Sequence, residues 1–250
     1  MIARFSFGNR ILRVPLDQGV DISLPVDAAA QLTRAWHAPP PVESPILYDR
    51  PASVSQGFSV NSFQITLAPH SHCTHTEWCG HFLSDRQPLP VNKVPLWMPA
   101  LLLSLFPRTD TQGQSWLTRE DLQHLFLSGE HIPAVIVRTL PNSGTKRTAN
   151  YSGQGAAAFE PEAMSFLREE GVCHLLTDLP SVDPEKDGGA LRAHRTFLNH
   201  SPEQEPLRTI TELVYVPDHC RDGLYVLNLQ LAPIPGDAVP SRPIIFPSAG

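Results

Sequence analysis

The chain alternates between short apolar runs and longer polar or proline-rich stretches. Two runs, 134–139 and 172–177, are almost continuously apolar, which is typical of strands buried on both faces. Residues 11–26 and 58–68 alternate apolar with polar positions and are rich in β-branched or aromatic types, so strands are expected there. The pattern therefore predicts short strands spread along the whole chain.

Alternation returns near the C-terminal end, where strands are expected over 210–216 and 224–231 as an antiparallel-looking pair. Helical spacing appears in three places, with Thr118 as an N-cap at the first and Gly171 ending the second. The helices are expected at 118–128, 161–170 and 191–198. Because strands and helices are mixed, we expect an α/β (α+β) fold in one domain covering residues 1–250.

Proline is the compositional outlier, with 26 residues in 250, while 41% of the chain remains hydrophobic. Proline breaks helix interiors and central strands, so long-helix and bundle folds are excluded. Residues 36–51 hold five of the prolines and are expected to form an irregular surface loop.

The net charge is −6 and no basic stripe exists, so nucleic acid and anionic membranes are not expected as partners. The most apolar stretch, 96–107, has 12 residues, whereas a membrane span needs ~20. No signal peptide is evident and the four cysteines do not suggest a disulfide scaffold. We therefore expect a cytoplasmic protein that acts on a small molecule.

A dense polar cluster carries the candidate chemistry. Four of the eleven histidines fall within twelve residues around Glu77: His70, His72, His75 and His81. Imidazole and carboxylate together suit Zn, Mn or Fe. In an extended segment His75 and Glu77 point to the same face and can share a metal. His70 and His72 have the other parity and reach that metal only if the chain turns between them and His75. A structural zinc site using Cys73 and Cys79 is disfavoured, because the chain has no C-x2–4-C pair.

The order of several short motifs then carries a family resemblance. Along the chain stand DISLPV (21–26), Thr74-His75-x-Glu77-x3-His81, TDLPSVDP (177–184), Ala193-His194-Arg195, Glu212, and Gly236-Asp237 with Pro240 and Arg242. In this order they resemble the putative cyclase family of metal-dependent hydrolases, which includes bacterial kynurenine formamidases and to which isatin hydrolases are similar. The resemblance implies a compact architecture around a barrel-like mixed β-sheet with short flanking helices. It also implies a homodimer or a higher homo-oligomer.

The same resemblance implies a site that holds one or two divalent ions, with zinc favoured and manganese as an alternative. His75 and Glu77 would be ligands, with Glu77 able to bridge two ions, and His81 would be the acid/base. His194 and Glu212 would complete the second ion's ligands.

The chain departs from the family pattern at several positions around the cluster. Ser71 stands where the family has its first histidine, so His70 or His72 is expected to substitute, and a turn through residues 71–73 favours His70. Cys73 replaces a glycine, Glu77 an aspartate, and Trp78-Cys79 an Ala-Pro pair. Because these changes surround the site, the resemblance does not fix which substrate this protein takes.

The expected function is hydrolysis of a small amide by a metal-activated water, with Glu77 and His81 as the catalytic residues. The substrate would be an N-formyl aryl amine such as N-formylkynurenine, a lactam or a lactone. Aromatic side chains that could stack on an aryl group are Trp36, Phe63, Trp78 and Phe82. Two alternatives remain: a cupin-like mononuclear oxygenase or isomerase using His70, His72 and Glu77, and a non-catalytic ligand-binding member of the same family.

Overall fold

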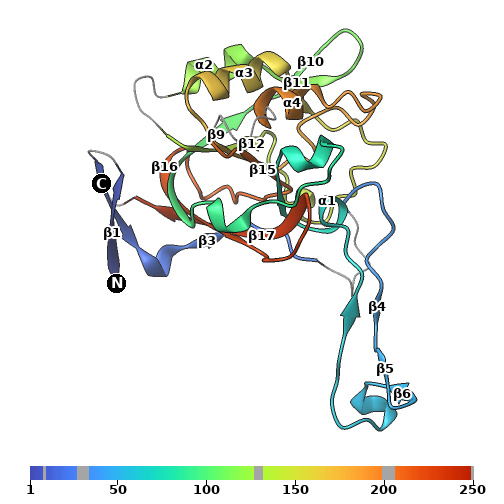
Figure 1. The fold of residues 1–250 in the computed structure, drawn as a ribbon. Helices are drawn as coiled ribbons and strands as arrows, with labels where there is room; N and C mark the ends of the chain where they lie inside the picture. The colour runs from blue at the N-terminus through green and yellow to red at the C-terminus, as the bar shows by residue number, and fades with distance from the viewer. Residues whose placement is uncertain (8–9, 27–33, 127–131, 199–205, 249–250) are drawn as a thin grey trace.

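The centre of the molecule is a mixed β-sheet that closes into a seven-stranded barrel, seen in a computed structural model (Figure 1). The structure describes residues 1–7, 10–26, 34–126, 132–198 and 206–248. In order around the barrel the strands are β16 (Gly223–Leu231), β9 (Trp97–Leu105), β12 (Ala134–Thr139), β14 (His174–Thr177), β15 (Thr209–Glu212), β8 (His75–Glu77) and β17 (Ala238–Pro247). Pairing of β16 with β17 closes the ring, and β3 (Val20–Asp21) extends the sheet from β17. The expected fold class is confirmed.

Strand direction changes around the barrel. β9, β12, β14 and β15 run parallel, whereas β8, β16 and β17 pair antiparallel with their neighbours. All six residues of β12 are buried, as its continuous apolar run predicts. The expected strand 224–231 exists as β16, whereas the expected strand 210–216 exists only over residues 210–212, within β15. The two do not pair with each other, because β15 lies between β14 and β8.

Three helices cover one side of the barrel, at the top of Figure 1. They are α2 (Arg119–Leu125), α3 (Pro161–Glu169) and α4 (Arg192–Leu198). Thr118 caps α2 by accepting a hydrogen bond from the Asp121 amide, and Gly171 follows α3 with a φ of 81°. Leu122 and Met164 are fully buried against the strands. All three expected helices are confirmed, although residues 127–128 of the first lie outside the described residues.

Smaller elements frame the barrel. An N-terminal hairpin packs through Leu12 and Val14 against Val226 and Phe246. Strands that lie beside the barrel are β1 (Ile2–Phe7), β2 (Arg10–Pro15), β10 (Arg108–Thr109), β11 (Ser115–Leu117) and β13 (Ala158–Phe159). The short helical turns are α1 (Pro69–His72), η1 (Leu16–Gln18), η2 (Val54–Gln56), η3 (Cys79–Phe82), η4 (Val91–Lys93) and η5 (Gly144–Arg147). None of the helices within the described ranges has the length and apolarity to cross a membrane.

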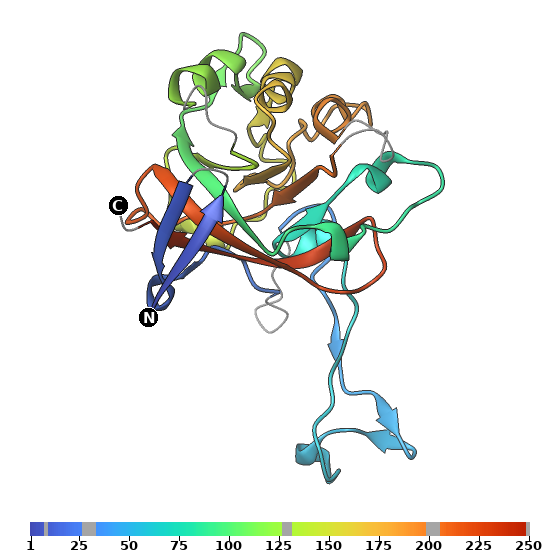
Figure 2. The same cartoon turned by 60° about the vertical axis from the view of Figure 1, so that its left-hand side comes forward.

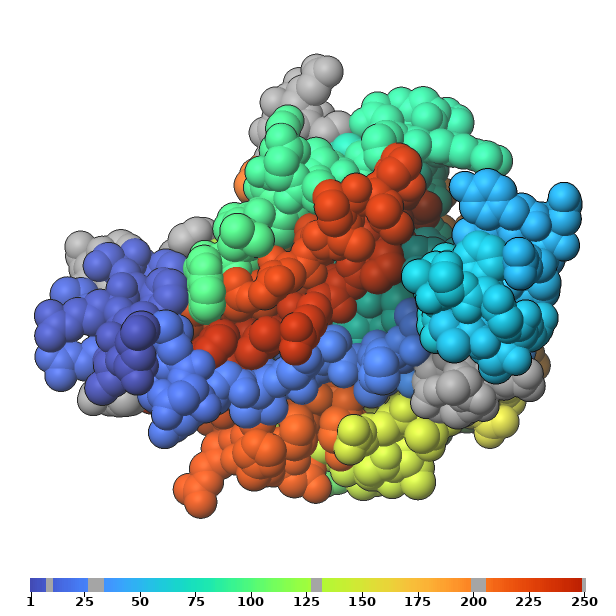
Figure 3. All heavy atoms as spheres, turned by 90° about the horizontal axis from the view of Figure 1, so that it is seen from below, coloured from blue at the N-terminus to red at the C-terminus, as the bar shows by residue number. Residues whose placement is uncertain are grey.

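Residues 38–68 form an arm that projects far from the barrel (Figures 1 and 2). Its strands are β4 (Val42–Glu43), β5 (Ile46–Leu47), β6 (Arg50–Pro51) and β7 (Gln64–Ile65). Among the residues that the structure describes, they pair only as β4–β7 and β5–β6. Seen from below, the arm and the N-terminal hairpin lie at opposite ends of the molecule (Figure 3). The strand expected over 58–68 is wrong for most of its length, because this segment lies on the arm and has only β4 beside it.

Candidate metal centre

A single helical turn, α1, changes the direction of the chain just before β8. The turn lets His70 reach the face of β8 that carries His75 and Glu77. The His70 Nδ1 atom lies 3.2 Å from Glu77 Oε2, and the His70 and His75 ring centroids are 4.9 Å apart. From the sequence, His70 is expected to face the same point as His75 only if the chain turns between them, and α1 supplies that turn.

His72 points the other way from the same turn. Its Nε2 atom lies 2.9 Å from the Ala38 carbonyl oxygen, and its Nδ1 accepts a hydrogen bond from the Ala68 amide. Of the two candidate histidines, the structure brings His70 to the cluster and leaves His72 outside it. The cupin-like set of His70, His72 and Glu77 consequently does not converge on one point.

The other half of the cluster comes from residues more than a hundred positions along the chain. Strand β15 pairs antiparallel with β8 and places Glu212 directly opposite His75, with His75 Nε2 and Glu212 Oε2 3.3 Å apart. Helix α4 brings His194, whose Nε2 atom lies 2.6 Å from Glu77 Oε1 and 3.6 Å from Glu212 Oε1. The pairing of β15 with β8 and the packing of α4 thus bring together candidate ligands that lie in three separate parts of the sequence.

Buried polar atoms without hydrogen bonds mark the middle of this cluster. His75 Nε2, both carboxylate oxygens of Glu77 and His194 Nε2 are buried without a hydrogen-bond partner of acceptable geometry. Leaving such groups unsatisfied costs roughly 1–3 kcal/mol each, or more for charged groups. They converge on one another, as ligands around a cation do. Within the described ranges, two sets of three ligand atoms lie within 4.8 Å of one another: His70, Glu77 and His81, and His75, Glu77 and Glu212. The residues therefore fit a divalent metal, and Glu77 belongs to both sets.

Two of the histidines that face the cluster have their other ring nitrogen held by an oxygen. Asp183 Oδ2 lies 2.6 Å from His194 Nδ1, and His75 Nδ1 lies 3.1 Å from the Cys73 carbonyl oxygen. A donor–acceptor partner at one ring nitrogen fixes the tautomer and aims the other nitrogen at a metal. Asp183 also accepts the Ala193 and His194 backbone amides at the start of α4. Asp183 thereby fixes both the first turn of α4 and the orientation of the His194 ring.

Asp237 plays the corresponding part on the other side of the cluster. Its Oδ2 atom lies 2.8 Å from His81 Nδ1 and 3.0 Å from His70 Nε2. The sequence shows Asp237 only as part of a C-terminal motif. Its contact with His81 on η3 depends on the pairing of β17, which Asp237 precedes, with β8. The Gly236-Asp237 pair in that motif is the one sequence signal that could have indicated the role of Asp237 in the cluster.

Charge pairing dominates the electrostatics of the cluster. Burial by itself would raise the pKa of the Glu77 carboxyl, but the facing imidazoles of His194 and His70 hold it well below its ordinary value. Burial would lower the pKa of His70, yet Asp237 and Glu77 raise it to about 10. The pKa of His194 is raised well above its ordinary value in spite of burial, because Glu77 and Asp183 face it. Hydrogen bonds from His70 and His81 lower the pKa of Asp237. The carboxylates stay ionised, which favours cation binding.

His81 occupies the open edge of the cluster on η3. Gly80 precedes it, and a Cβ atom there would lie 2.1 Å from the Gln87 carbonyl oxygen, so only glycine fits. His81 Nδ1 lies 4.0 Å from Glu77 Oε2 and its side chain is 27% exposed. A group that is near the cluster yet reachable from outside is placed to exchange protons with a bound molecule.

A cavity of about 330 Å³ opens above the cluster. Its walls include Glu77, His81, His194 and Glu212, and its apolar wall consists of Trp36, Pro184 and Leu191. Ser181 and Asp183 of the TDLPSVDP segment also line it. The volume suits a small organic molecule.

The other three aromatic residues expected at the substrate do not line this cavity. Trp78 is buried and donates its Nε1 hydrogen to the Gln87 carbonyl, because it follows Glu77 on the opposite face of the strand. Phe82 lies at the end of η3 beneath the Arg195 guanidinium, at 4.6 Å. Phe63 is on the arm and 71% exposed. Trp36 alone of the expected aromatics reaches the cavity.

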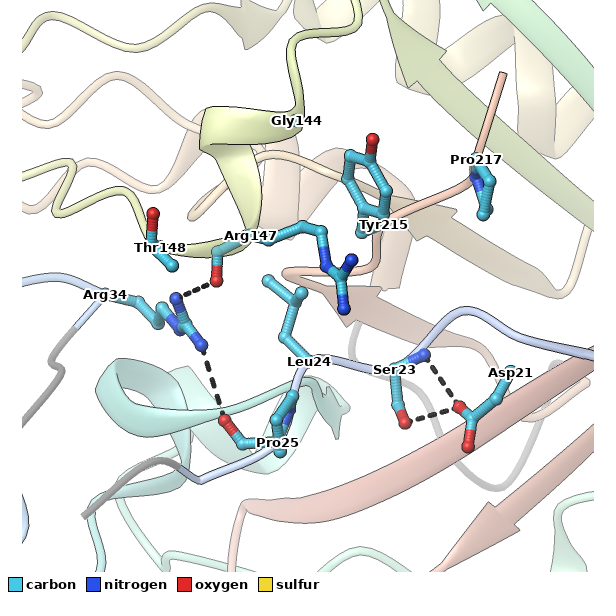
Figure 4. Close-up of a pocket in the computed structure, with 10 residues that line it drawn as sticks. All are labelled: Asp21, Ser23, Leu24, Pro25, Arg34, Gly144, Arg147, Thr148, Tyr215 and Pro217. Atoms are coloured by element: carbon cyan, nitrogen blue, oxygen red, sulfur yellow. Dashed lines mark hydrogen bonds between the residues drawn. The ribbon is translucent and has the colours of Figure 1, made fainter. Parts of the chain in front are cut away.

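A second hollow of about 470 Å³ shares no lining residue with the cavity over the cluster (Figure 4). Asp21 and Ser23 of the DISLPV segment line it, and the Arg147 guanidinium lies over the Tyr215 ring at 5.7 Å. The DISLPV segment contacts the metal cluster indirectly, because the Leu24 amide donates to Thr74 Oγ1 beside His75. The segment therefore serves to frame the cluster.

Comparison with known proteins agrees with the geometry. The model of the family described as putative cyclase matches residues 20–184. A kynurenine formamidase of Bacillus cytotoxicus is 27% identical over 230 residues, covering 91% of this chain and 97% of the relative. A kynurenine formamidase of Bacillus cereus is 28% identical over 238 residues, with 91% and 97% covered.

Solved structures share the fold. Isatin hydrolase A from Labrenzia aggregata superposes with a TM-score of 0.63 at 17% identity, covering 92% of this chain and 94% of that one. A predicted metal-dependent hydrolase from Bacillus stearothermophilus gives a TM-score of 0.63 at 17% identity, with 91% and 97% covered. Since the family model spans well over half of the sequence, the chain belongs to the putative cyclase family.

Proposed function

We propose that this protein is a metal-dependent hydrolase of small amides that acts on non-peptide C–N bonds. The observation that carries the proposal is the set of buried nitrogen and oxygen atoms on His75, Glu77 and His194 that converge on one another without making a hydrogen bond. A stable protein compensates such atoms, and a divalent cation is the partner that suits imidazole nitrogens and carboxylate oxygens together.

The proposed ligands are His70, His75, Glu77, His194 and Glu212. Two groups of candidate ligand atoms, His70–Glu77–His81 and His75–Glu77–Glu212, meet at Glu77. His194 Nε2 lies 2.6 Å from the same carboxylate, and this arrangement supports two ions. Zinc is the proposed metal and manganese the alternative. A cytoplasmic location is also part of the proposal, and it agrees with the four cysteines all being free thiols.

The proposed chemistry divides between the metal and the protein. Bound divalent ions supply a nucleophilic water at neutral pH and polarise a carbonyl group. His81 takes the proton of the attacking water and returns it to the leaving amine. Asp237 holds the His81 ring by its Nδ1 atom, so that Nε2 is the atom that exchanges the proton. Trp36 offers an apolar surface for an aryl group.

The substrate we propose is an N-formyl aryl amine, with a lactam or lactone as the alternative. The support comes from the names of the curated relatives, which are kynurenine formamidases, and from the isatin hydrolases among the structural neighbours. Glu77, which lines the cavity, stands where the family has an aspartate and is one methylene longer. This difference leaves the choice among these substrates to experiment.

The test is metal quantification on the purified protein, followed by a hydrolysis screen headed by N-formylkynurenine and isatin. We expect close to two ions per chain and turnover of at least one compound. The variant His81→Ala should keep the metal and lose hydrolysis by about 10²–10⁴-fold, the usual effect of removing a general acid/base. Undiminished turnover in that variant, or a metal-free wild-type protein, contradicts the assignment. Metal binding without turnover of any compound supports the non-catalytic alternative.

A further inference from the structure

The wall of the cavity over the metal cluster carries negative charge without a matching positive side chain. Besides the cluster itself, the wall includes Glu185 and Asp187, from the loop that leads into α4. None of the 19 lysines and arginines lies in this wall as the structure describes it, and the stretches outside the described ranges contain no lysine or arginine. A negatively charged part of a substrate therefore meets no cationic side chain in this cavity.

Backbone amides hold both of these carboxylates in place. Each oxygen of Glu185 accepts the Gly153 amide at 2.9 Å, and the two oxygens of Asp187 accept the Gly189 and Leu191 amides at 2.7 Å. These hydrogen bonds leave acceptor capacity, because an ionised carboxyl group has about four lone-pair sites. Neither carboxylate forms an ion pair with another described residue, so no side chain of the protein neutralises them.

The basic residues that are close in sequence stay outside the wall. Lys186 stands between the two carboxylates in the chain, but it is exposed and does not line the cavity. Arg195 on α4 donates to the Ala190 carbonyl, and its guanidinium lies over the Phe82 ring at 4.6 Å. Neither side chain offers a partner to an anion in the cavity.

Bound metal does not reverse the sign of the charge around the cavity. Six carboxylates belong to the cluster and the wall: Glu77, Glu212, Asp183, Asp237, Glu185 and Asp187. Two divalent ions would contribute four positive charges, which leaves two carboxylate charges in excess. A metal-bound hydroxide would add a further negative charge to the same region.

The aromatic part of the wall also suits a cation. Trp36 lines the same cavity and is 48% exposed. A tryptophan face attracts an ammonium group through its ring quadrupole, whereas a carboxylate that loses its water without gaining a partner is destabilised. Fixed carboxylates beside an indole therefore favour a positive substituent over a negative one.

We propose that this cavity selects its substrates by charge. It takes small aryl amides that are neutral or carry an ammonium group, it disfavours those that carry a carboxylate, and Glu185 is a specificity-determining residue. The inference rests on the proposed hydrolase function and narrows its substrate class. An aryl formamide without a carboxylate is then a better substrate than N-formylkynurenine, which carries one.

The test uses three formanilides that differ only in the group para to the formamide, which is CH₂COO⁻, CH₃ or CH₂NH₃⁺. The methylene group separates the charge from the ring, so that the formamide has a similar intrinsic reactivity in all three. With the metal-loaded full chain, kcat/KM for the carboxylate should be at least about 10-fold below that for the neutral compound. The ammonium compound should equal or exceed the neutral one. A carboxylate that is hydrolysed as well as the neutral compound overturns the proposal.

The variant Glu185→Gln isolates the contribution of one charge. Glutamine keeps the size of the side chain and an oxygen that can accept the Gly153 amide, so only the charge is lost. The ratio of kcat/KM between the ammonium and carboxylate compounds should fall by about 3-fold or more. The matched control is Glu162→Gln, an exposed glutamate on α3 outside the cavity wall, and it should keep the wild-type ratio. An unchanged ratio in Glu185→Gln, or an equal change in both variants, contradicts the role of Glu185.

Binding without turnover separates this inference from the proposed function. The amine products with CH₂NH₃⁺ and CH₂COO⁻ are titrated into the metal-loaded protein by calorimetry, and the ammonium compound should bind at least about 10-fold more tightly. If no formanilide is hydrolysed, the hydrolase assignment fails, while this order of binding still supports selection by charge. In that case, binding of neither amine, or tighter binding of the carboxylate, overturns the charge selection as well.

Discussion

The hydrogen bond between Asp183 and His194 allows a sharp test of the metal centre. The substitution Asp183→Asn removes the anion that lies 2.6 Å from His194 Nδ1, in a side chain that is 4% exposed. The native carboxylate uses both oxygens, Oδ1 for the Ala193 amide and Oδ2 for the His194 amide and ring. An amide side chain has one acceptor oxygen, so the substituted residue must turn its NH₂ group towards one of these donors.

The expected effect on metal binding follows from that geometry. Removing the partner of a metal-binding histidine weakens metal affinity by about 10–100-fold, which corresponds to about 1.4–2.7 kcal/mol. We expect the upper half of this range, because the ring loses a buried charged partner and the start of α4 loses a cap in the same variant. The assay is competition for zinc against a chromophoric chelator at constant pH.

A matched control exists in the same loop. Asp187 also uses both oxygens to accept backbone amides, from Gly189 and Leu191, but it has no hydrogen bond to His194. The variant Asp187→Asn should therefore bind zinc as wild type does, although its loop is similarly disturbed. If Asp183→Asn binds zinc within about twofold of wild type, or if both variants lose affinity equally, the role of Asp183 in orienting His194 is refuted.

Two further outcomes test the surroundings of the cluster. The variant Asp237→Asn should lower kcat by about 10–100-fold with metal in saturating excess, since the carboxylate holds His81 by its Nδ1. It should also weaken metal affinity, since the same oxygen lies 3.0 Å from Nε2 of the proposed ligand His70. The exposed Asp85→Asn serves as control, and unchanged turnover would reject the contact. Metal affinity should rise with pH between about 7 and 9, because His70 has a metal-free pKa of about 10 and the pKa of His194 is also raised, so that the metal must displace their protons. Each displaced proton contributes up to about tenfold per pH unit, and chelator competition that is flat or falls with pH would contradict the ion pairs described.

Much of the local structure was predictable, because it depends on neighbours in the sequence. The continuous apolar run of β12, the capping residue Thr118 and the glycine after α3 each act within a few residues, and the structure confirms all three. The apolar segment that forms β9 and the Pro-rich tail that forms β17 were not identified as strands. Prolines within β17 obscured its pattern, and its pairing partner β8 lies far along the chain.

The residues of the candidate site also divide into those that the sequence identified and those that only the tertiary structure placed. Residue types and motif order were enough to single out His75, Glu77, His81, His194 and Glu212, and the structure brings these five together. The choice between His70 and His72 needed the helical turn α1, because two residues of the same parity diverge once the backbone leaves the extended form. Asp237 stood in a recognised motif, but its contact with His81 was found only in three dimensions, where β17 pairs with β8.

By itself, the sequence determined the chemistry that this protein carries: clustered imidazoles and carboxylates, and short elements separated by stiff proline-rich loops. Tertiary structure decided which atoms converge, because the candidate metal centre combines three distant segments through the pairing of β15 with β8 and the packing of α4, which no local sequence pattern specifies. It also showed that residues 58–68, which have the alternation of a strand, lie on a projecting arm. Alternation specifies two faces, but only a partner surface makes one of them buried.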